Sequence, residues 1–79
     1  MISADILAYL AKSLVDNPDD VQVTSSEEGA GEVVLELHVH PDDMGKVIGK
    51  RGRTAKALRA VVKAAATREG TSATVEIVE

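Results

Sequence analysis

Two glycines frame a pair of cationic residues in the segment Val47-Ile48-Gly49-Lys50-Arg51-Gly52. Glycine lets a backbone turn without a Cβ and lets another backbone come close to it. A helical pattern begins directly after Gly52, and the first turn of a helix has unpaired N–H groups and the positive end of the helix dipole. The segment therefore predicts a phosphate-binding turn between two helices, in which Lys50 and Arg51 add two positive charges.

Periodic apolar residues predict a helix on each side of this turn. Pro41 suits the first turn of the preceding helix, Asp42 and Asp43 complement its dipole, and Gly49 ends it. Its expected apolar side consists of Met44, Val47 and Ile48. The following helix ends at Gly70, and its expected inward residues are Ala55, Leu58, Val61, Val62 and Ala65.

The remaining parts of the chain predict one more helix and three strands. The helix runs from about Ser3, its expected cap, to Asp16. Its apolar residues recur at helical spacing: Ile6, Leu7, Leu10, Ala11 and Leu14. A short strand around Val21 and Val23 is followed by an expected turn over Ser25 to Gly31. A longer strand is expected to bury Val33, Leu35, Leu37 and Val39 and to expose Glu32, Glu36, His38 and His40. In the last strand, Ala73, Val75 and Ile77 alternate with Thr74, Glu76 and Val78.

These elements predict an α+β fold with the order α-β-β-α-α-β, in which a three-stranded sheet is covered on one face by three helices. With 79 residues, the chain has the length of one small domain, residues 1–79. It contains no cysteine, which excludes a disulfide framework, a thiol nucleophile and a thiolate metal site. No stretch approaches the ~20 apolar residues of a membrane span and the N-terminus lacks the features of a signal peptide, so we expect a cytoplasmic protein.

Charge is divided unevenly along the chain. Residues 1–43 contain ten acidic residues and a single base, Lys12, whereas residues 44–79 contain eight bases and three acidic residues. All eight bases lie between Lys46 and Arg68, in a stretch without acidic residues. Local potential attracts a polyanion even when the net charge, here −4, is negative. The acidic half is expected either to confine nucleic acid to one face by repulsion or to serve solubility.

The turn and its surroundings resemble the KH-domain family of RNA-binding modules, in which an Ile-Gly-x-x-Gly loop between two helices clamps about four nucleotides of a single strand. The run from His40 to Arg53 is similar to the small bacterial single-KH proteins of the KhpA type, and the element order matches the type II arrangement over essentially the whole chain. The resemblance implies a homodimer, or a complex with a larger KH-domain partner. It also implies a role as an RNA chaperone or post-transcriptional regulator linked to cell-envelope growth and cell shape.

The resemblance also implies where single-stranded RNA would bind. It makes Gly49 to Gly52 the backbone clamp, and it makes Ile48, Leu58 and the aliphatic residues of Val33 to Val39 candidates for an apolar groove that receives the bases. Basic residues beside the turn could extend the path of the RNA backbone. The expected RNA-binding residues are Lys46, Ile48, Gly49, Lys50, Arg51, Gly52, Arg53, Lys56 and Arg59. Tyr9 is the only aromatic residue, so base contacts should be mostly aliphatic and weakly selective.

Plainer explanations exist for each of these features. A glycine pair between helices is commonly only an αα-turn, and a basic helix face is commonly only solvated. His38 and His40 share one strand face, but no third ligand accompanies them, so no metal site is expected. The spacing from Gly45 to Gly49 fails as a P-loop, because it is one residue short and Arg51 stands where Ser or Thr would bind magnesium. Turn solvation or helix N-terminal electrostatics explains the carboxylate pairs Asp19-Asp20, Glu27-Glu28 and Asp42-Asp43, so we predict no catalytic residue and no cofactor.

An interaction module is the alternative function. In this hypothesis the surface from Val47 to Val62 docks a second copy or a partner protein, and RNA contact is incidental. Ala60, Ala64 and Ala66 make the long helix thin enough for another backbone to come close. We expect a homodimer whose contact lies at or near the turn, so that RNA and the second subunit partly compete.

Overall fold

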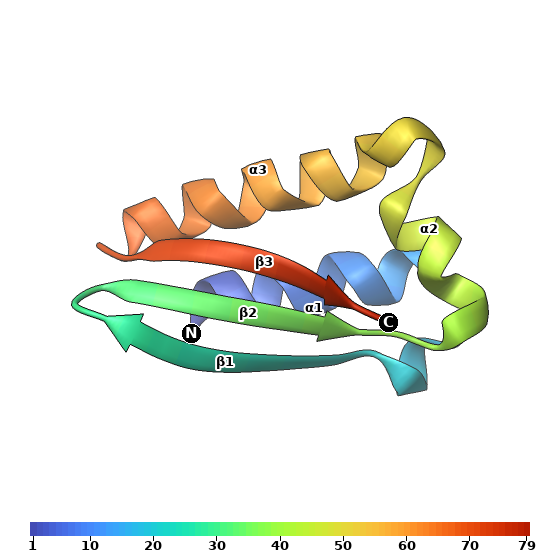
Figure 1. The fold of residues 1–79 in the computed structure, drawn as a ribbon, viewed down its shortest axis with the longest axis horizontal. Coiled ribbons are helices and arrows are strands. Elements are labelled where there is room, and N and C mark those ends of the chain that lie inside the picture. The colour runs from blue at the N-terminus through green and yellow to red at the C-terminus, as the bar shows by residue number, and fades with distance from the viewer.

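Three strands form one sheet in the computed structural model, which describes residues 1–79. The helices and strands follow one another in the predicted order (Figure 1). Their bounds are α1 Ile2–Leu14, β1 Gln22–Gly29, β2 Glu32–His38, α2 Met44–Ile48, α3 Arg53–Arg68 and β3 Ser72–Val78. Short 3-10 turns precede β1 at Pro18–Asp20, precede α2 at Pro41–Asp43, and join α2 to α3 at Lys50–Gly52. The predicted α+β fold class is confirmed.

β2 is the central strand of the sheet. It pairs with β1 in the antiparallel direction, with Leu37 opposite Val23, and with β3 in the parallel direction, with Leu37 opposite Ile77. A tight turn is enough to join β1 to β2, whereas parallel strands need a long crossover, which α2 and α3 provide. Because β2 and β3 are parallel, the C-terminal ends of both strands lie at the same end of the sheet, next to α2 (Figure 1).

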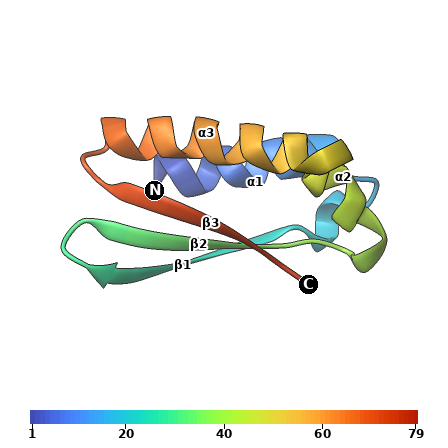
Figure 2. The same cartoon turned by 45° about the horizontal axis from the view of Figure 1, so that its top comes forward.

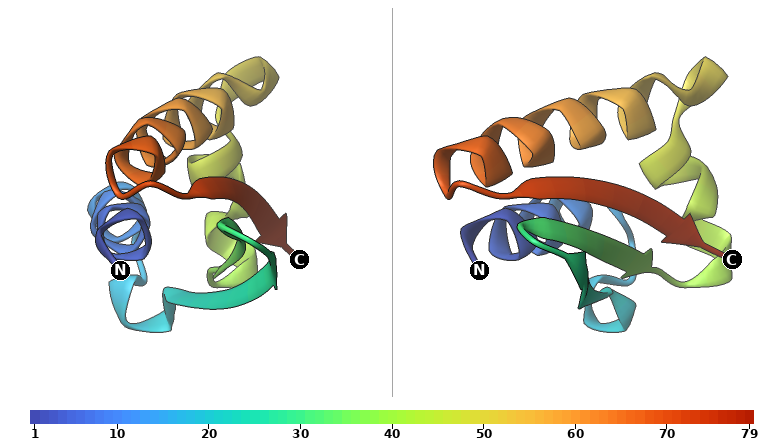
Figure 3. Two further views of the ribbon diagram at one scale, coloured as in Figure 1. Left: turned by 90° about the vertical axis from the view of Figure 1, so that its left-hand side faces the viewer. Right: turned by 60° about the vertical axis from the view of Figure 1, so that its left-hand side comes forward.

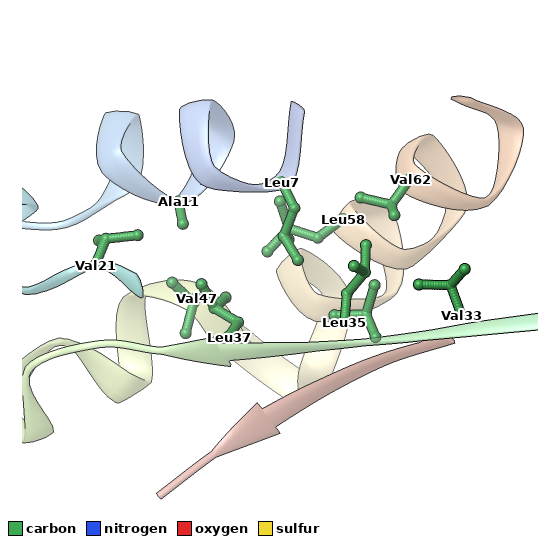
Figure 4. Packing of buried hydrophobic residues seen from close by; sticks show 10 residues of the cluster. Leu7, Ala11, Val21, Val33, Leu35, Leu37, Val47, Leu58 and Val62 are labelled. Atoms are coloured by element: carbon green, nitrogen blue, oxygen red, sulfur yellow. The ribbon is translucent and has the colours of Figure 1, made fainter. Parts of the chain in front are cut away.

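Both long helices cover one face of the sheet, and α2 lies at one end of this layer (Figures 2 and 3). The inward side chains of the sheet and helices meet in a purely aliphatic core (Figure 4). Its members are Leu7, Ala11, Val21, Val33, Leu35, Leu37, Val47, Leu58, Val62 and Val75. Val47 comes from α2, so the helix before the cationic turn is fastened to the core by one completely buried side chain.

α1 differs from the prediction at both ends. Ser3 is not its cap, because it lies within the helix and is completely buried. Glu69, which follows α3, accepts hydrogen bonds from the N–H of Ser3 at 2.7 Å and from the N–H of Ile2 at 3.3 Å. An acceptor from a distant element thus does what a capping serine would do for the first turn. The helix ends at Leu14 and not at Asp16.

β1 is longer than predicted. The expected turn over Ser25 to Gly31 is wrong, because the strand continues to Gly29 and the turn consists of Ala30 and Gly31. The second half of β1 is polar and exposed, so it lacks the apolar alternation that marks a strand. Backbone pairing with β2 keeps it extended instead, with one irregularity in register between Glu27 and Gly29.

Two apolar residues that were predicted to point inward are exposed. The exposed fraction is 38% for Ile48 and 47% for Val61. Ala65 is only half-buried, whereas Ala66, predicted on the thin outer surface of the long helix, is completely buried. The buried residues of α3 are Ala55, Leu58, Val62 and Ala66. These four residues share one face of the helix, and Val61 lies about 100° to one side of it.

Candidate nucleic-acid interface

The turn between α2 and α3 lies at one corner of the molecule (Figure 1). α2 ends where the N–H of Gly49 donates to the carbonyl of Gly45 at 2.9 Å, and the N–H of Gly52 then donates to the carbonyl of Gly49 at 3.1 Å. α3 begins at Arg53 without a side-chain cap. The N–H of Arg53 donates to the carbonyl of Lys50, and no side chain caps the other N–H groups of the first turn, which point toward the turn between the helices. This is the arrangement that binds phosphate at helix N-termini.

Position 49 requires glycine for two reasons: its backbone conformation and the lack of space for a Cβ. Its φ of 76° and ψ of 173° belong to a region that residues with a Cβ rarely adopt. A Cβ at this position would overlap Oγ1 of Thr54, and would lie 2.6 Å from Cβ and 2.9 Å from N of the same residue. The end of α2 is therefore packed directly against the start of α3. Gly52 has a φ of 72° but open space around it, so it needs conformational freedom alone.

Lys50 and Arg51 form the tip of the turn. Both residues are exposed, and neither forms an ion pair. Arg51 is the only non-glycine residue with a positive φ, at 59°, a conformation that costs a residue with a Cβ about 1–2 kcal/mol. Strain of this kind is concentrated at functional sites. The turn thus presents two uncompensated positive charges on a strained backbone.

The predicted basic residues of α3 continue from this turn. Arg53 is the first residue of the helix, and Lys56, Arg59 and Lys63 share one flank of it at helical spacing. The Nε of Arg59 donates to the carbonyl of Val75 at 3.3 Å, which places this basic flank on the side of β3. All four bases are exposed. The positive charge of the turn therefore extends along the β3 side of α3.

Lys46 differs from the other predicted RNA-binding bases. It lies on α2, and its Nζ is 3.5 Å from Oδ2 of Asp16, just beyond the end of α1. This carboxylate neutralises part of the charge that Lys46 would offer to a phosphate. Its contribution to RNA binding should be smaller than those of Lys50 and Arg51.

The flank of α3 that faces α1 is apolar over the first half of the helix. A pocket of about 260 Å³ lies between the two helices. It is lined by Leu10, Ser13, Leu14, Thr54, Ala57, Leu58 and Val61. Thr54 links this pocket to the turn, because it is the residue packed against Gly49. We call this feature the α1/α3 pocket.

The residues predicted to form an apolar groove do not lie together. Val33, Leu35 and Leu37 belong to the core and are closed to a nucleotide base, because α1 and α3 cover this face of β2. Leu58 lines the α1/α3 pocket and is only 4% exposed. Ile48 lies at the end of α2, next to the turn, and is open to solvent. Of the residues named for the groove, Ile48 is thus the one that is both exposed and adjacent to the cationic turn.

Acidic side chains lie on the sheet face that no helix covers. Glu32 and Glu36 alternate with the inward residues of β2, and Glu76 lies opposite Glu36 on β3. Glu36 accepts a hydrogen bond from Oγ1 of Thr24 at 3.2 Å and lies 3.8 Å from Nε2 of His38. This face is negative, whereas the turn and the adjoining flank of α3 are positive.

Neither histidine belongs to a metal-binding group. Nδ1 of His40 accepts a hydrogen bond from the N–H of Asp42 at 3.0 Å, and His38 lies beside Glu36. No three side chains of His, Cys, Asp or Glu are grouped so that they could hold a metal ion. No helix combines the length and the apolar composition needed to cross a membrane.

Asp43 has a role that the sequence interpretation missed. Turn solvation or helix N-terminal electrostatics was predicted to explain it, but it is only 1% exposed. Its carboxylate accepts hydrogen bonds from the N–H of Asp16 at 3.3 Å, from the N–H of Asn17 at 3.0 Å and from Nδ2 of Asn17 at 3.1 Å. Burial opposes ionisation, but these three donors outweigh it and hold the pKa of Asp43 below its ordinary value of 3.8. A contact across 26 residues leaves no periodic signal in the sequence.

The geometry agrees with a comparison against protein families, in which the model of the KhpA/KhpB KH domain matches residues 4–77. The chain belongs to the KhpA/KhpB family of KH domains. The RNA-binding protein KhpA of Clostridium acetobutylicum is 58% identical over 73 residues, which cover 92% of this chain and 96% of the relative. The RNA-binding protein KhpA of Halalkalibacterium halodurans is 53% identical over 74 residues, which cover 94% and 96% of the two chains. The KhpA family consists of RNA-binding proteins and not of enzymes, so the predicted resemblance and the absence of catalysis are confirmed.

Solved structures of Era have the same fold. Era in complex with MgGDPNP and nucleotides 1506–1542 of 16S ribosomal RNA matches with a TM-score of 0.68, and a variant of Aquifex aeolicus Era bound to GDP and aluminium fluoride matches with a TM-score of 0.66. Both are 20% identical and cover 96% of this chain, which spans 29% of the length of each Era chain. At this level of identity, the likeness to Era shows that the two proteins share a fold and nothing more.

Proposed function

We propose that this chain binds single-stranded RNA by clamping the RNA backbone at Gly49 to Gly52. The observation that carries this proposal is the exposed cationic turn packed directly against the start of α3. Lys50 and Arg51 supply charge to one phosphate or two, and the first N–H groups of α3 supply hydrogen-bond donors. The RNA-binding names of the KhpA relatives support the same class of ligand.

Beyond the turn, the RNA backbone follows the basic flank of α3. Lys56 and Arg59 lie on this flank, and the bond from Arg59 to Val75 holds its guanidinium in place. Base contacts remain few, since Ile48 is aliphatic and Tyr9 lies on α1, outside the clamp. Weak contacts that tolerate many sequences suit an RNA chaperone or a post-transcriptional regulator in the cytoplasm.

The clamp is tested by replacing both Lys50 and Arg51 with Asp. We expect this double variant to lose RNA binding, because two acidic groups would repel the phosphates, and to keep its fold, because exposed loop charges contribute little to stability. Binding is measured by fluorescence anisotropy with a labelled oligouridine, and folding by circular dichroism.

The matched control is the double variant Lys12→Asp and Arg68→Asp, which changes the net charge by the same amount away from the turn. We expect the control to retain most of the affinity. Equal losses in the two double variants, or an unchanged affinity after substitution of Lys50 and Arg51, would contradict the clamp.

We also propose that the chain forms a homodimer, and that the α1/α3 pocket takes part in the contact. The pocket is apolar, and two of its large side chains remain exposed, Leu14 at 41% and Val61 at 47%. A second copy covering them would remove apolar surface from water, which favours association. Because Thr54 lines the pocket and is packed against Gly49 of the clamp, RNA and the second copy partly compete. A larger KH-domain protein that uses the same surface is the alternative partner.

The dimer is tested by substituting Val61 with Glu. We expect the unchanged chain to sediment as a dimer at micromolar concentration and the variant to sediment as a monomer, since a carboxylate in an apolar contact must lose its hydration. Thr67→Glu places the same charge on α3 outside the pocket and should leave the dimer intact. A strict monomer well above micromolar concentration would eliminate the dimer. A dimer that saturating oligouridine does not perturb would eliminate the competition.

A further inference from the structure

Asp43 stands at the start of α2, but its side chain does not cap that helix. All three of its hydrogen bonds go to Asp16 and Asn17, the residues that follow α1. The carboxylate is thus buried in a contact between two segments that are far apart in the sequence. It holds the start of α2 against the two residues that follow α1.

α2 needs such a fastening. The helix has five residues, and isolated helices of this length are not stable in water. Val47 is its only buried residue, and the close contact of Gly49 with Thr54 holds its C-terminal end alone. The bonds of Asp43 hold its N-terminal end. The ion pair between Lys46 and Asp16 joins the same two segments, but both side chains are exposed, so it adds little to the connection.

We propose that Asp43 is a positioning residue for RNA binding, which holds α2 so that the turn at Gly49 to Gly52 has the geometry needed to clamp the RNA backbone. This inference rests on the RNA-binding function proposed above. Asp43 itself is buried and does not touch RNA in this proposal.

The packing explains why a small movement of α2 reaches the turn. Gly49 ends α2 and approaches Thr54 so closely that a Cβ does not fit between them. A five-residue helix spans only about 7–8 Å, so a rotation at Asp43 is carried almost undiminished to Gly49. The turn then either shifts or separates from α3. Both changes move Lys50 and Arg51 away from the first N–H groups of α3.

The chain contains a second carboxylate that makes the same kind of contact far from the clamp. Glu69 binds the N–H groups of Ile2 and Ser3 at the start of α1, as Asp43 binds those of Asp16 and Asn17 beyond its end. Glu69 follows the C-terminal end of α3, whereas the turn lies at the N-terminal end. Glu69→Gln is therefore a matched control for Asp43→Asn, because each substitution removes one charge and one acceptor from a bond to α1 or its flanking backbone.

The experiment compares Asp43→Asn with Glu69→Gln in two measurements. The first is the affinity for a fluorescein-labelled oligouridine at a temperature where both variants are folded. The second is the amide NMR spectrum of the RNA-free protein. We expect both variants to unfold at a lower temperature than the unchanged chain. Relative to the unchanged chain, Asp43→Asn should weaken the affinity for the RNA by about fivefold or more, and Glu69→Gln should leave it unchanged. The amide signals of Gly49 to Gly52 should shift in Asp43→Asn and stay in place in Glu69→Gln.

Further outcomes separate the positioning role from the proposed function. If Asp43→Asn does not fold, Asn17→Ala removes one of the three donors and should produce smaller changes in the same direction. If the unchanged chain does not bind oligouridine at low salt, RNA binding fails, while the amide signals of the turn still report whether Asp43 positions it. The positioning role is overturned if the signals of Gly49 to Gly52 and the RNA affinity respond to Asp43→Asn no more than to Glu69→Gln.

Discussion

At the scale of single residues, three glycines in and beside the cationic turn differ in backbone conformation and in the space around them. Gly49 has a positive φ and no room for a Cβ, and Gly52 has a positive φ with open space around it. Gly45 lies inside α2 and has neither restriction. The three positions are close in sequence, so their substitution by alanine separates conformational strain from steric overlap in one region of the molecule.

We predict a graded effect of alanine at these positions on the free energy of unfolding. Gly45→Ala should raise it by about 0.5–1 kcal/mol, because alanine favours the helix. Gly52→Ala should lower it by about 1–2 kcal/mol through backbone strain. Gly49→Ala should lower it most, since Thr54 must move as well. Urea denaturation followed by circular dichroism measures the order. A Gly49→Ala variant as stable as Gly52→Ala would contradict the close packing of α2 against α3.

At the scale of elements, α1 is held by carboxylates near both ends. Glu69 binds the N–H of Ser3 and then the N–H of Ile2, and these bonds hold the pKa of Glu69 below its ordinary value of 4.5. Burial of Asp43 opposes ionisation, but its bonds with Asn17 and Asp16 hold the pKa of Asp43 below 3.8. A carboxylate whose pKa is lowered by folding stabilises the folded state above its unfolded pKa. That stabilisation is lost as the pH falls through the folded pKa.

We therefore predict that acid destabilises the fold partly through these two groups. The free energy of unfolding should decrease as the pH falls from about 5 to about 2, because the unfolded chain binds protons at Asp43 and Glu69 that the folded chain does not. In the double variant Asp43→Asn and Glu69→Gln the decrease should be shallower, by up to about two protons in its maximal slope. Urea denaturation over this pH range checks the difference. The same slope in both proteins would exclude a role of the two carboxylates in acid sensitivity.

At the scale of the whole molecule, charge is sorted by face. Glu32, Glu36 and Glu76 lie on the open face of the sheet, while the bases of the turn and α3 lie on the helical side. The net charge of −4 describes neither side. A polyanion that approaches the molecule is repelled by one face and attracted by the other, so binding is oriented before any contact forms.

RNA binding should consequently depend on salt even though the protein is acidic. With about two to four phosphates neutralised, the logarithm of the association constant should fall with the logarithm of salt concentration at a slope of about −1.5 to −3, using ~0.7 per phosphate on a single strand. Anisotropy titrations of oligouridine at several salt concentrations measure this slope. We expect little difference between oligouridine and oligoadenosine. An affinity independent of salt, or a strong preference for one sequence, would argue against a backbone clamp.

Local patterns in the sequence were enough to predict the helices around the turn, the central strand and the cationic turn itself. The turn could be predicted because two glycines and two bases act within a few residues, and β2 because alternation between Val33 and Leu37 has the period of the strand itself. The division of charge was also visible along the chain. All these features depend on neighbours in sequence.

Only the tertiary structure decided the features that depend on distant partners. The polar half of β1 is a strand because β2 supplies its backbone bonds, and α1 starts without a capping serine because Glu69 accepts from the N–H of Ser3 across 66 residues. Asp43 was predicted to complement the dipole of the helix it precedes, but its carboxylate is buried and accepts hydrogen bonds from Asp16 and Asn17 instead. The α1/α3 pocket exists only where two helices from opposite ends of the chain meet. Hydrogen-bond partners and cavity walls are set by folding in three dimensions, and composition and periodicity carry no record of them.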